Sequence, residues 1–319
     1  MRYMAKLNFN SPLHSGQREK DYNFTDIIIH SDTLFSGIIN CYSFLYGKRK
    51  TDDLVARFIN GEVPFRVSSC FPYYKDELYV PKPINMGLSK AIDDEKEAKK
   101  IRFIPLEVLT RGVLNNKVNI LPNGFISLKY INPFIKVVDE IPRVALDSIT
   151  NASMIYYVSN TLFDKDAGLW FAVDFFDDEI KKEFTAALRL LGDEGIGGER
   201  TYGSGLFELE GGDLLPLDIK NDNQGKHVLL SMYFPQTDEI EKITGPYEIV
   251  EREGYAYNLF GIAHQRRKRR INMFLEGSVF DFRPKGRVVD VTPRGCTEMT
   301  LVKNGLAFTL KVGYDQYRG

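Results

Sequence analysis

The chain of 319 residues carries 42 Lys and Arg against 43 Asp and Glu, a formal net charge of −1, so any nucleic-acid contact must come from local basic clusters. A content of 43% hydrophobic and 27% charged residues excludes a disordered chain, a collagen and a coiled coil, and the length predicts about two domains. Three dispersed cysteines and no apolar run near the ~20 residues that span a bilayer predict a cytoplasmic protein with no zinc site and no membrane partner.

The first elements read as a strand, a turn and a helix. Residues 2–9 alternate between apolar and polar side chains, which predicts a strand, and residues 10–12 supply a turn. Ser31 or Asp32 can cap a helix with apolar residues at helical spacing that ends at Gly47. Capping alone explains an aspartate at this place, so we assign Asp32 no catalytic role.

Two short strands follow this helix. Residues 63–69 and 77–80 are rich in Val, Phe and Tyr and are predicted to pair, which completes a βαββ unit. After these strands the pattern of apolar and polar residues becomes irregular. The segment contains turn signals and a charged, helix-prone stretch at residues 90–102. We interpret residues 83–141 as an insertion.

Strand and helix patterns return after the insertion. Residues 154–158 and 168–176 are apolar and aromatic enough for strands. Residues 178–191 have the period of an amphipathic helix that stops at Gly192, and a further strand is predicted at residues 206–209. The alternation is typical of a ferredoxin-like unit carrying an insertion, within an α+β fold.

The domain organisation follows from these elements. Residues 1–210 form the predicted N-terminal domain, and the weakly apolar segment 211–226 is its boundary. Residues 227–319 form a second domain that is richer in strands, with one hint of a helix at residues 237–244. Its predicted extended segments are residues 228–234, 247–260, 271–282, 288–291 and 306–312.

The stretch GIGGERTYGSG at residues 195–205 is the most specific motif. A dinucleotide fingerprint fails here, because the sixth position from Gly195 is Arg200 and because the loop runs from helix to strand. The exposed N–H groups of such a loop, with Arg200 and Tyr202, can hold phosphates and stack a base. The alternative is a tight turn before an edge strand.

Three smaller features point to the same chemistry. His14, in a turn with Ser15, can donate to a phosphate or stack on a base, although a surface histidine explains it equally well. The helix start at Ser31 offers free N–H groups to an anion, and its alternative is an ordinary capped helix. Arg143 follows Pro142, whose fixed backbone can aim the guanidinium at a phosphate, unless it is one more surface arginine.

Residues 264–270 read HQRRKRR, with five consecutive cations at Arg266, Arg267, Lys268, Arg269 and Arg270. Such a block is often a solvated loop. Five adjacent cations repel one another unless an anion is near, and an RNA backbone supplies one. We therefore expect this block to contact phosphates.

These motifs together resemble the CRISPR RAMP proteins, a family of RNA-binding subunits with ferredoxin-like or RRM-like folds. The chain departs from the family pattern at one place: after Leu146-Asp147 it has Ser148, where the family often has a basic residue. The resemblance itself rests on four stretches. In combination and order they are most similar to the subunit that caps the 5′ handle of CRISPR RNA in type III-A (Csm) effector complexes. The four stretches are GIGGERTYGSG, PLHSG at residues 12–16, HSDTLFSG at residues 30–37 and PRVALD at residues 142–147.

The resemblance implies a non-catalytic subunit without cofactor or metal, built from tandem ferredoxin-like domains, in which the insertion is a thumb-like segment that splays guide nucleotides. It implies three partners: the 5′ handle of the crRNA, a large polymerase-like subunit and a backbone RAMP subunit. The alternative is an endoribonuclease of the same superfamily that processes precursor CRISPR RNA with His14 as general acid or base. The predicted RNA-binding residues are His14, Ser15, Ser31, Arg143, Gly197, Gly198, Arg200, Tyr202, Gly203, Arg266, Arg267, Lys268 and Arg269.

Overall fold

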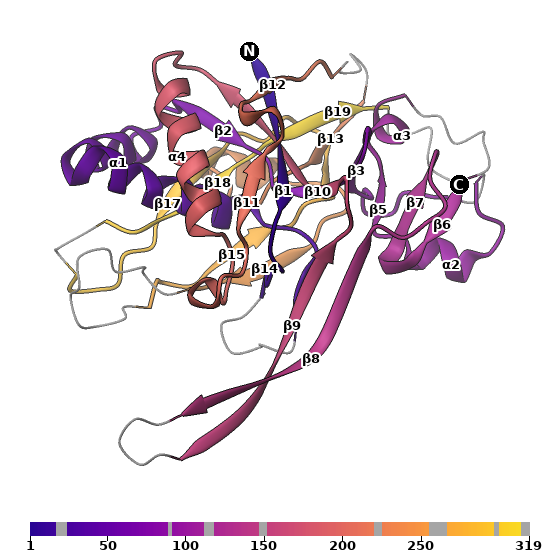
Figure 1. The fold of residues 1–319 in the computed structure, drawn as a ribbon. Coiled ribbons are helices and arrows are strands. Elements are labelled where there is room, and N and C mark those ends of the chain that lie inside the picture. Colours follow the sequence, from indigo (N-terminus) through magenta and orange to yellow (C-terminus); the bar gives the residue numbers. More distant parts are fainter. Residues whose placement is uncertain are drawn as a thin grey trace.

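The computed structural model describes residues 1–16, 24–88, 91–111, 118–146, 152–219, 225–254, 267–296 and 300–313. They form a mixed α+β structure dominated by one large sheet, which confirms the α+β part of the predicted fold class (Figure 1). The strands of this sheet are β1 Arg2–Phe9, β2 Phe65–Val67, β3 Phe71–Tyr74, β4 Glu77–Pro81, β5 Phe103–Pro105, β6 Asn119–Leu121, β7 Phe125–Ser127, β10 Ala167–Phe175, β11 Phe207–Leu209 and β12 Leu215–Pro216. Their order is β11-β1-β10-β3-β4-β5-β7-β6, with β2 beside β10 and β12 beside β1.

The centre of the sheet is the antiparallel pair β1 and β10, both predicted as strands. Its register runs from Arg2 opposite Asp174 to Leu7 opposite Leu169. Every residue of β10 is buried, because side chains of both faces enter a hydrophobic core. Trp170 is fully buried, and its indole N–H donates to the Tyr79 carbonyl at 2.9 Å. A strand of this kind has a continuous apolar sequence rather than an alternating one.

Two helices, α1 (Ser31–Ile59) and α4 (Ile180–Glu194), pack together on one face of the sheet (Figure 1). The predicted helix end at Gly47 is a break with φ of 80°, after which the chain resumes a helix that the sequence analysis did not anticipate. Helix α4 ends at Gly195, which has φ of 79°. The predicted stop at Gly192 is therefore wrong: this glycine lies inside the helix, where a Cβ atom would collide with the Phe207 carbonyl.

The predicted pairing of residues 63–69 with 77–80 is also wrong. Strand β2 pairs with β10, and β4 pairs instead with β3. Tyr74 lies opposite Glu77, so a two-residue turn connects β3 to β4, and Lys75 in that turn has φ of 54°. A partner this close along the chain forms a hairpin at lower entropic cost than a more distant strand.

The predicted insertion contributes mainly to the edge of the large sheet. Its helices α2 (Glu95–Lys100) and α3 (Leu106–Arg111), the 3-10 turn η1 (Pro122–Gly124) and strands β5, β6 and β7 lie together at one side of the molecule (Figure 1). The projecting element is the ribbon formed by β8 (Ile135–Leu146) and β9 (Ser153–Phe163), most of which lies beyond the predicted limit at residue 141. Most of this ribbon lies further along the chain than the predicted insertion, and its role as a thumb-like segment stays a prediction.

The C-terminal half forms small sheets that pack on the first half. The predicted strand at residues 228–234 ends at Leu229, and the predicted helix at 237–244 is a 3-10 helix, η4 (Thr237–Lys242). The other 3-10 turns are η2 (Arg200–Tyr202) and η3 (Glu210–Gly212). The strands are β13 Lys226–Leu229 with β16 Val279–Phe280 and β19 Thr309–Val312, β14 Ile249–Arg252 with β15 Ile271–Phe274, and β17 Gly286–Asp290 with β18 Val302–Leu306.

The two halves share their hydrophobic cores. Val302 and Leu306 pack in the core beneath α1, whereas Val228 and Phe308 pack on the other face of the sheet with Trp170. The tandem ferredoxin-like arrangement and the domain limits stay predictions, but the halves bury each other's apolar surface. Among the described helices, none is long and apolar enough to cross a membrane.

Candidate functional site

The glycine-rich loop at residues 195–205 folds against the turn that follows β1. The Gly198 amide donates to the His14 carbonyl at 2.8 Å, and the Gly205 amide donates to the Pro12 carbonyl at 2.8 Å. Gly205 has φ of 78°, and a Cβ atom there would collide with the Ile196 carbonyl. The loop is thus held by its own backbone and by the N-terminal turn, so part of its glycine content serves the fold.

The three glycines predicted to approach RNA have different surroundings. A Cβ atom on Gly198 would lie 2.6 Å from Cδ2 of His14, and one on Gly197 would collide with the His14 carbonyl. Gly203 has φ of 77° and open space around its Cα. The close approach at Gly197 and Gly198 is therefore to the chain itself, and among the three only Gly203 faces open space.

His14 and Ser15 are fixed parts of the structure. The His14 ring is only 5% exposed, which overturns the alternative of a surface histidine, and its Nδ1 lies 2.7 Å from the Ser159 carbonyl on β9. The Ser15 hydroxyl donates to the Ile28 carbonyl at 2.8 Å. Both residues line a cavity, so the turn joins the glycine-rich loop and the ribbon at one place.

This cavity, of about 550 Å³, lies where the N-terminal turn, the start of α1, the glycine-rich loop and the C-terminal half meet. Its volume is in the range of small-molecule sites. The basic side chains Arg200, Arg252, Lys268 and Lys303 line it together with the acidic Asp32, Glu199 and Glu253. Its other lining residues are His14, Ser15, Gly16, His30, Thr33, Ser36, Gly37, Asn40, Leu191, Gly195, Ile196, Gly197, Gly198 and Gly254.

Asp32 is an ion-pair partner rather than the predicted cap. The residue before the helix is His30, whose side chain makes no capping hydrogen bond. Asp32 is 1% exposed, and its carboxylate accepts from Arg252 Nη2 at 2.9 Å and from Lys303 Nζ at 2.9 Å. Burial alone would raise the pKa of Asp32, but the two cations hold that pKa well below its usual range. This triad joins α1 to both β14 and β18.

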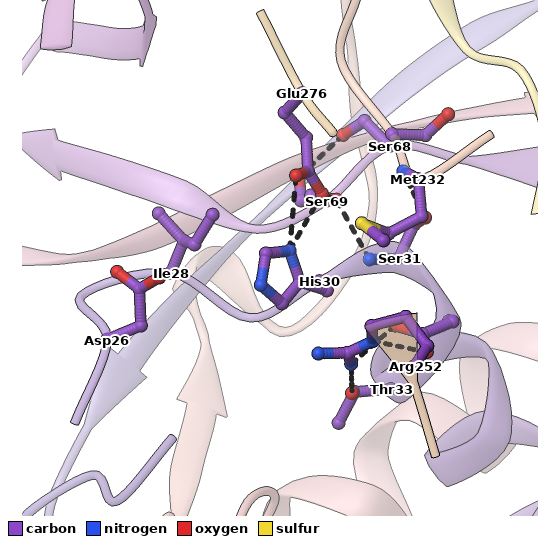
Figure 2. Close-up of polar contacts among 12 residues, drawn as sticks. Asp26, Ile28, His30, Ser31, Thr33, Ser68, Ser69, Met232, Arg252 and Glu276 are labelled. Carbon is purple, nitrogen blue, oxygen red and sulfur yellow. Dashed lines mark hydrogen bonds and ion pairs between the residues drawn. The ribbon is translucent and has the colours of Figure 1, made fainter. Parts of the chain in front are cut away.

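A second buried pair lies beside the triad (Figure 2). His30 Nδ1 is 3.0 Å from Glu276 Oε1, and the Ser69 hydroxyl donates to the same carboxylate. Burial opposes the imidazolium charge, but Glu276 raises the pKa of His30 above its usual value, and His30 in turn lowers the pKa of the buried Glu276. Ion pairs and hydrogen bonds between the two halves therefore hold His30 and Asp32, which line the cavity, in fixed positions.

Ser31 is not an anion site. Its amide donates to the Ser69 hydroxyl at 2.8 Å, and its own hydroxyl accepts from the Met232 amide at 3.0 Å (Figure 2). The side chain is fully buried. Its predicted N–H group is therefore already used inside the protein, and Ser31 does not line the cavity.

Arg143 and Tyr202 meet outside the cavity. Arg143 on β8 lies opposite Tyr156 on β9, and its guanidinium carbon is 5.4 Å from the centre of the Tyr202 ring. The Tyr202 side chain is 60% exposed. This contact attaches the ribbon to the glycine-rich loop, and it leaves much of the Tyr202 ring accessible to a ligand.

The basic block divides between the cavity and local ion pairs. Lys268 lines the cavity, whereas Arg267 pairs with Glu253 at 2.5 Å and Arg270 pairs with Glu253 at 2.6 Å. Arg269 donates to the Asp290 carbonyl at 2.6 Å. The carboxylate of Glu253 thus supplies a nearby anion for Arg267 and Arg270, and phosphate contact by this block stays a prediction. Residues 264–266, including the predicted Arg266, lie outside the described residues.

Arg252, Lys303 and Glu276 were not among the residues predicted from the sequence. Lys303 lies in the strand VKNGL, whose mixed composition gave only a weak signal that the lysine is buried and needs a carboxylate partner. Arg252 and Glu276 lie in segments without a comparable signal. In the described part of the chain, no three His, Cys, Asp or Glu side chains gather as a metal site would need.

Comparison with known proteins assigns relatives to both halves of the chain. The model of the RAMP superfamily matches residues 6–208, and that of the CRISPR Csm4 C-terminal domain matches residues 222–312. A protein of Thermococcus onnurineus, CRISPR system Cms protein Csm4, is 29% identical over 81% of this chain and 84% of its own length. Its namesake from Methanocaldococcus jannaschii is 26% identical over 91% of this chain and 88% of its own.

Two solved structures share the fold. A chain of the Csm3–Csm4 subcomplex in the type III-A CRISPR-Cas interference complex has a TM-score of 0.68 and 22% identity, covering 98% of this chain and all of that one (100%). A chain of the Csm1–Csm4 cassette in complex with cA4 has a TM-score of 0.62 and 23% identity, covering 98% of both. The architecture described above is therefore one already seen in solved complexes.

Proposed function

The chain belongs to the RAMP superfamily, and we propose that it is a non-catalytic, RNA-binding subunit of a type III-A CRISPR effector complex. In this proposal it is the Csm4-type subunit, which agrees with the C-terminal match and with the names of its relatives. Its ligand is the 5′ handle of the crRNA. The observation that carries the proposal is the cavity where the glycine-rich loop, the His14 turn and four basic side chains meet.

The charges around the cavity suggest which side chains hold phosphates. Arg252 and Lys303 are buried and share the Asp32 carboxylate, so the protein already neutralises part of their charge. Arg200 and Lys268 are the other basic side chains that line the cavity. We assign the phosphate contacts to these two, because charge-assisted hydrogen bonds to phosphate are strong and an RNA backbone supplies such groups repeatedly.

A base contact is assigned to Tyr202. Its ring is 60% exposed and already faces the Arg143 guanidinium. Single-stranded RNA is commonly held by stacking of a base on such an aromatic face beside a cation. The adjacent ribbon carries exposed apolar side chains, Leu146 and Met154 among them, and we assign to it the splaying of guide nucleotides.

The proposed protein partners are the large polymerase-like subunit and a backbone RAMP subunit. Chains of the same fold occur in Csm3–Csm4 and Csm1–Csm4 complexes, which supports both partners. We further propose that this subunit bridges the two. An RNA held by a chain of net charge −1 also needs other subunits to neutralise the rest of its backbone.

The test is coexpression with both partners and a CRISPR array, followed by purification through a tag on this chain and sequencing of the bound RNA. The expected RNA is a crRNA whose 5′ handle is protected from nuclease. The double variant Arg200→Ala/Lys268→Ala should lose this protection and reduce the log–log salt slope by roughly 0.7 per lost contact. Arg111→Ala, an exposed arginine on α3, is the matched control. Protection that survives the double variant would refute the assignment.

The rival activity, cleavage of precursor RNA by His14, has less support. The ring is buried and Nδ1 contacts the Ser159 carbonyl, an arrangement that holds the imidazole in place. Incubation of the purified chain with repeat RNA in the absence of metal should leave the RNA intact. Cleavage at a single position that His14→Ala abolishes would instead establish the enzyme.

A further inference from the structure

A cluster of cations lies at the N-terminal end of β1, far from the cavity. Arg2 on β1 and Arg66 on β2 both pair with Asp174 on β10, each with a closest contact of 2.8 Å. The side chains of these three residues are 18%, 13% and 12% exposed in that order. Two guanidinium groups thus share one carboxylate, and one positive charge is left without compensation inside the cluster.

Aromatic rings interleave with these cations. The Arg66 guanidinium carbon is 5.4 Å from the ring centre of Phe176 and 5.4 Å from that of Phe308. Arg2 lies 4.7 Å from the centre of the same Phe308 ring. Phe176 is 61% exposed, so a large aromatic face borders the guanidinium and is open to solvent. The buried Nε of Arg66 has no hydrogen-bond partner among the described residues.

Cations of the C-terminal half extend this cluster: Arg283 lies near enough to act on both Arg66 and His227, and Lys311 acts on His227. Burial lowers the pKa of Arg66. The Asp174 carboxylate raises that pKa, and the charges of the exposed Arg283 and of Arg2 lower it further. His227 on β13 lies directly opposite Lys311 on β19. Burial, with the charges of Lys311 and Arg283, lowers the pKa of His227 to about 4. Arg2, Arg66 and Arg283 thus place like charges near one another around the single carboxylate of Asp174, and an external anion would offset their repulsion.

We propose that this surface, the β1-end cluster of Arg2, Arg66, Phe176, Arg283 and Lys311, binds single-stranded RNA. It is separate from the handle site, because β1 is 8 residues long and at about 3.3 Å per residue carries the chain about 25 Å from Arg2 toward the His14 turn. In Figure 1 the N-terminus and the ribbon lie at opposite ends of the molecule. The choice of RNA as the polyanion rests on the proposed function.

The combination of groups favours RNA over an acidic protein segment. Carboxylates of a protein partner need only the cations, whereas a single strand presents a phosphate and a flat base in every nucleotide. The exposed Phe176 ring next to a guanidinium matches that repeat: the ring stacks a base while Arg283 and Lys311 contact phosphates. This surface gives the subunit a second hold on RNA, at the end of the sheet opposite the handle.

The test uses the full chain and a labelled oligouridine long enough to reach both ends of β1, with affinity followed by fluorescence anisotropy over a salt series. Phe176→Ala should weaken binding about five- to 150-fold, since one stacked base is lost. Arg283→Gln should reduce the log–log salt slope by about 0.7. Lys99→Gln, an exposed cation on α2, is the charge-matched control and should change neither. Both test positions are exposed, and thermal unfolding checks that the fold persists.

A probe containing 4-thiouridine adds a direct readout, because ultraviolet light should crosslink it to the peptide that carries Phe176. The inference is overturned if Phe176→Ala and Arg283→Gln behave like Lys99→Gln, or if polyglutamate competes at the surface while the RNA salt slope stays unchanged. If Arg200→Ala/Lys268→Ala still weakens RNA binding in the same preparations, the proposed function stands even though the second RNA surface is refuted. A wild-type chain that binds no oligouridine and no handle RNA would overturn both.

Discussion

Replacing Asp32 by Asn tests the main feature that the structure adds to the sequence. The carboxylate is 1% exposed and accepts hydrogen bonds from Arg252 Nη2 at 2.9 Å, Arg252 Nε at 3.1 Å and Lys303 Nζ at 2.9 Å. A neutral amide in its place would leave two cations, 8% and 6% exposed, without their counter-charge. Removing one member of a buried ion pair typically costs about 3–5 kcal/mol, whereas losing a helix cap costs about 1 kcal/mol.

The assay is urea unfolding followed by Trp170 fluorescence and by circular dichroism. Trp170 is the single tryptophan of the chain and is fully buried, so its emission reports the core that the two halves share. Asp32→Asn should lower the free energy of unfolding by about 3–5 kcal/mol. Asp52→Asn removes an exposed partner of Lys48 on the same helix and should cost less than about 1 kcal/mol.

A rescue variant separates charge from shape. When Met replaces Arg252 and Lys303 and Leu replaces Asp32, no charge of the triad remains buried, and much of the lost stability should return. A loss of only about 1 kcal/mol for Asp32→Asn, the value of a lost cap, would contradict a buried ion-pair role for Asp32. Unfolding transitions of Asp32→Asn that match those of the Asp52→Asn control by both optical probes would contradict it as well.

Two further outcomes are expected. Gly198→Ala should lower the free energy of unfolding by about 1–3 kcal/mol, because its Cβ atom would lie 2.6 Å from the His14 ring, whereas Gly203→Ala should cost about 1 kcal/mol for its φ of 77° alone. Equal losses in denaturant titrations would contradict this difference. The His30–Glu276 pair should stabilise the protein fully between the usual pKa values of Glu, 4.5, and His, 6.5. Its contribution should fall as pH rises through the raised pKa of His30 and as pH drops through the lowered pKa of Glu276, and a flat difference between wild type and His30→Gln across pH would disprove it.

The elements with strong local patterns were predictable from the sequence. The strand at residues 2–9, the strands around residues 154–158 and 168–176 and the helix that begins near residue 178 are all present. Their side-chain periods are set by backbone geometry within a few residues, so no distant contact is needed to read them. The resemblance to the RAMP family, drawn from short motifs, is confirmed by the match over residues 6–208.

Strand partners and the extent of the projecting ribbon needed the tertiary structure. A period of two residues marks a strand but does not say which strand it meets, so β2 was assigned to a hairpin and lies instead beside β10. The ribbon of β8 and β9 continues well past residue 141, because the paired strands run from Ile135 opposite Phe163 to Leu146 opposite Ser153.

The site divides in the same way. The glycine-rich loop and the His14 turn were recognisable as motifs, since glycines and a histidine near small residues stand out in any chain. Asp32 and Arg252, however, are 220 positions apart, and nothing near either residue names its partner. Electrostatic energy depends on distance and burial rather than on sequence separation. The sequence thus marked the glycine-rich loop and the His14 turn as candidate binding segments, whereas the packing of the C-terminal half on α1 brought Arg252 and Lys303 into the same cavity.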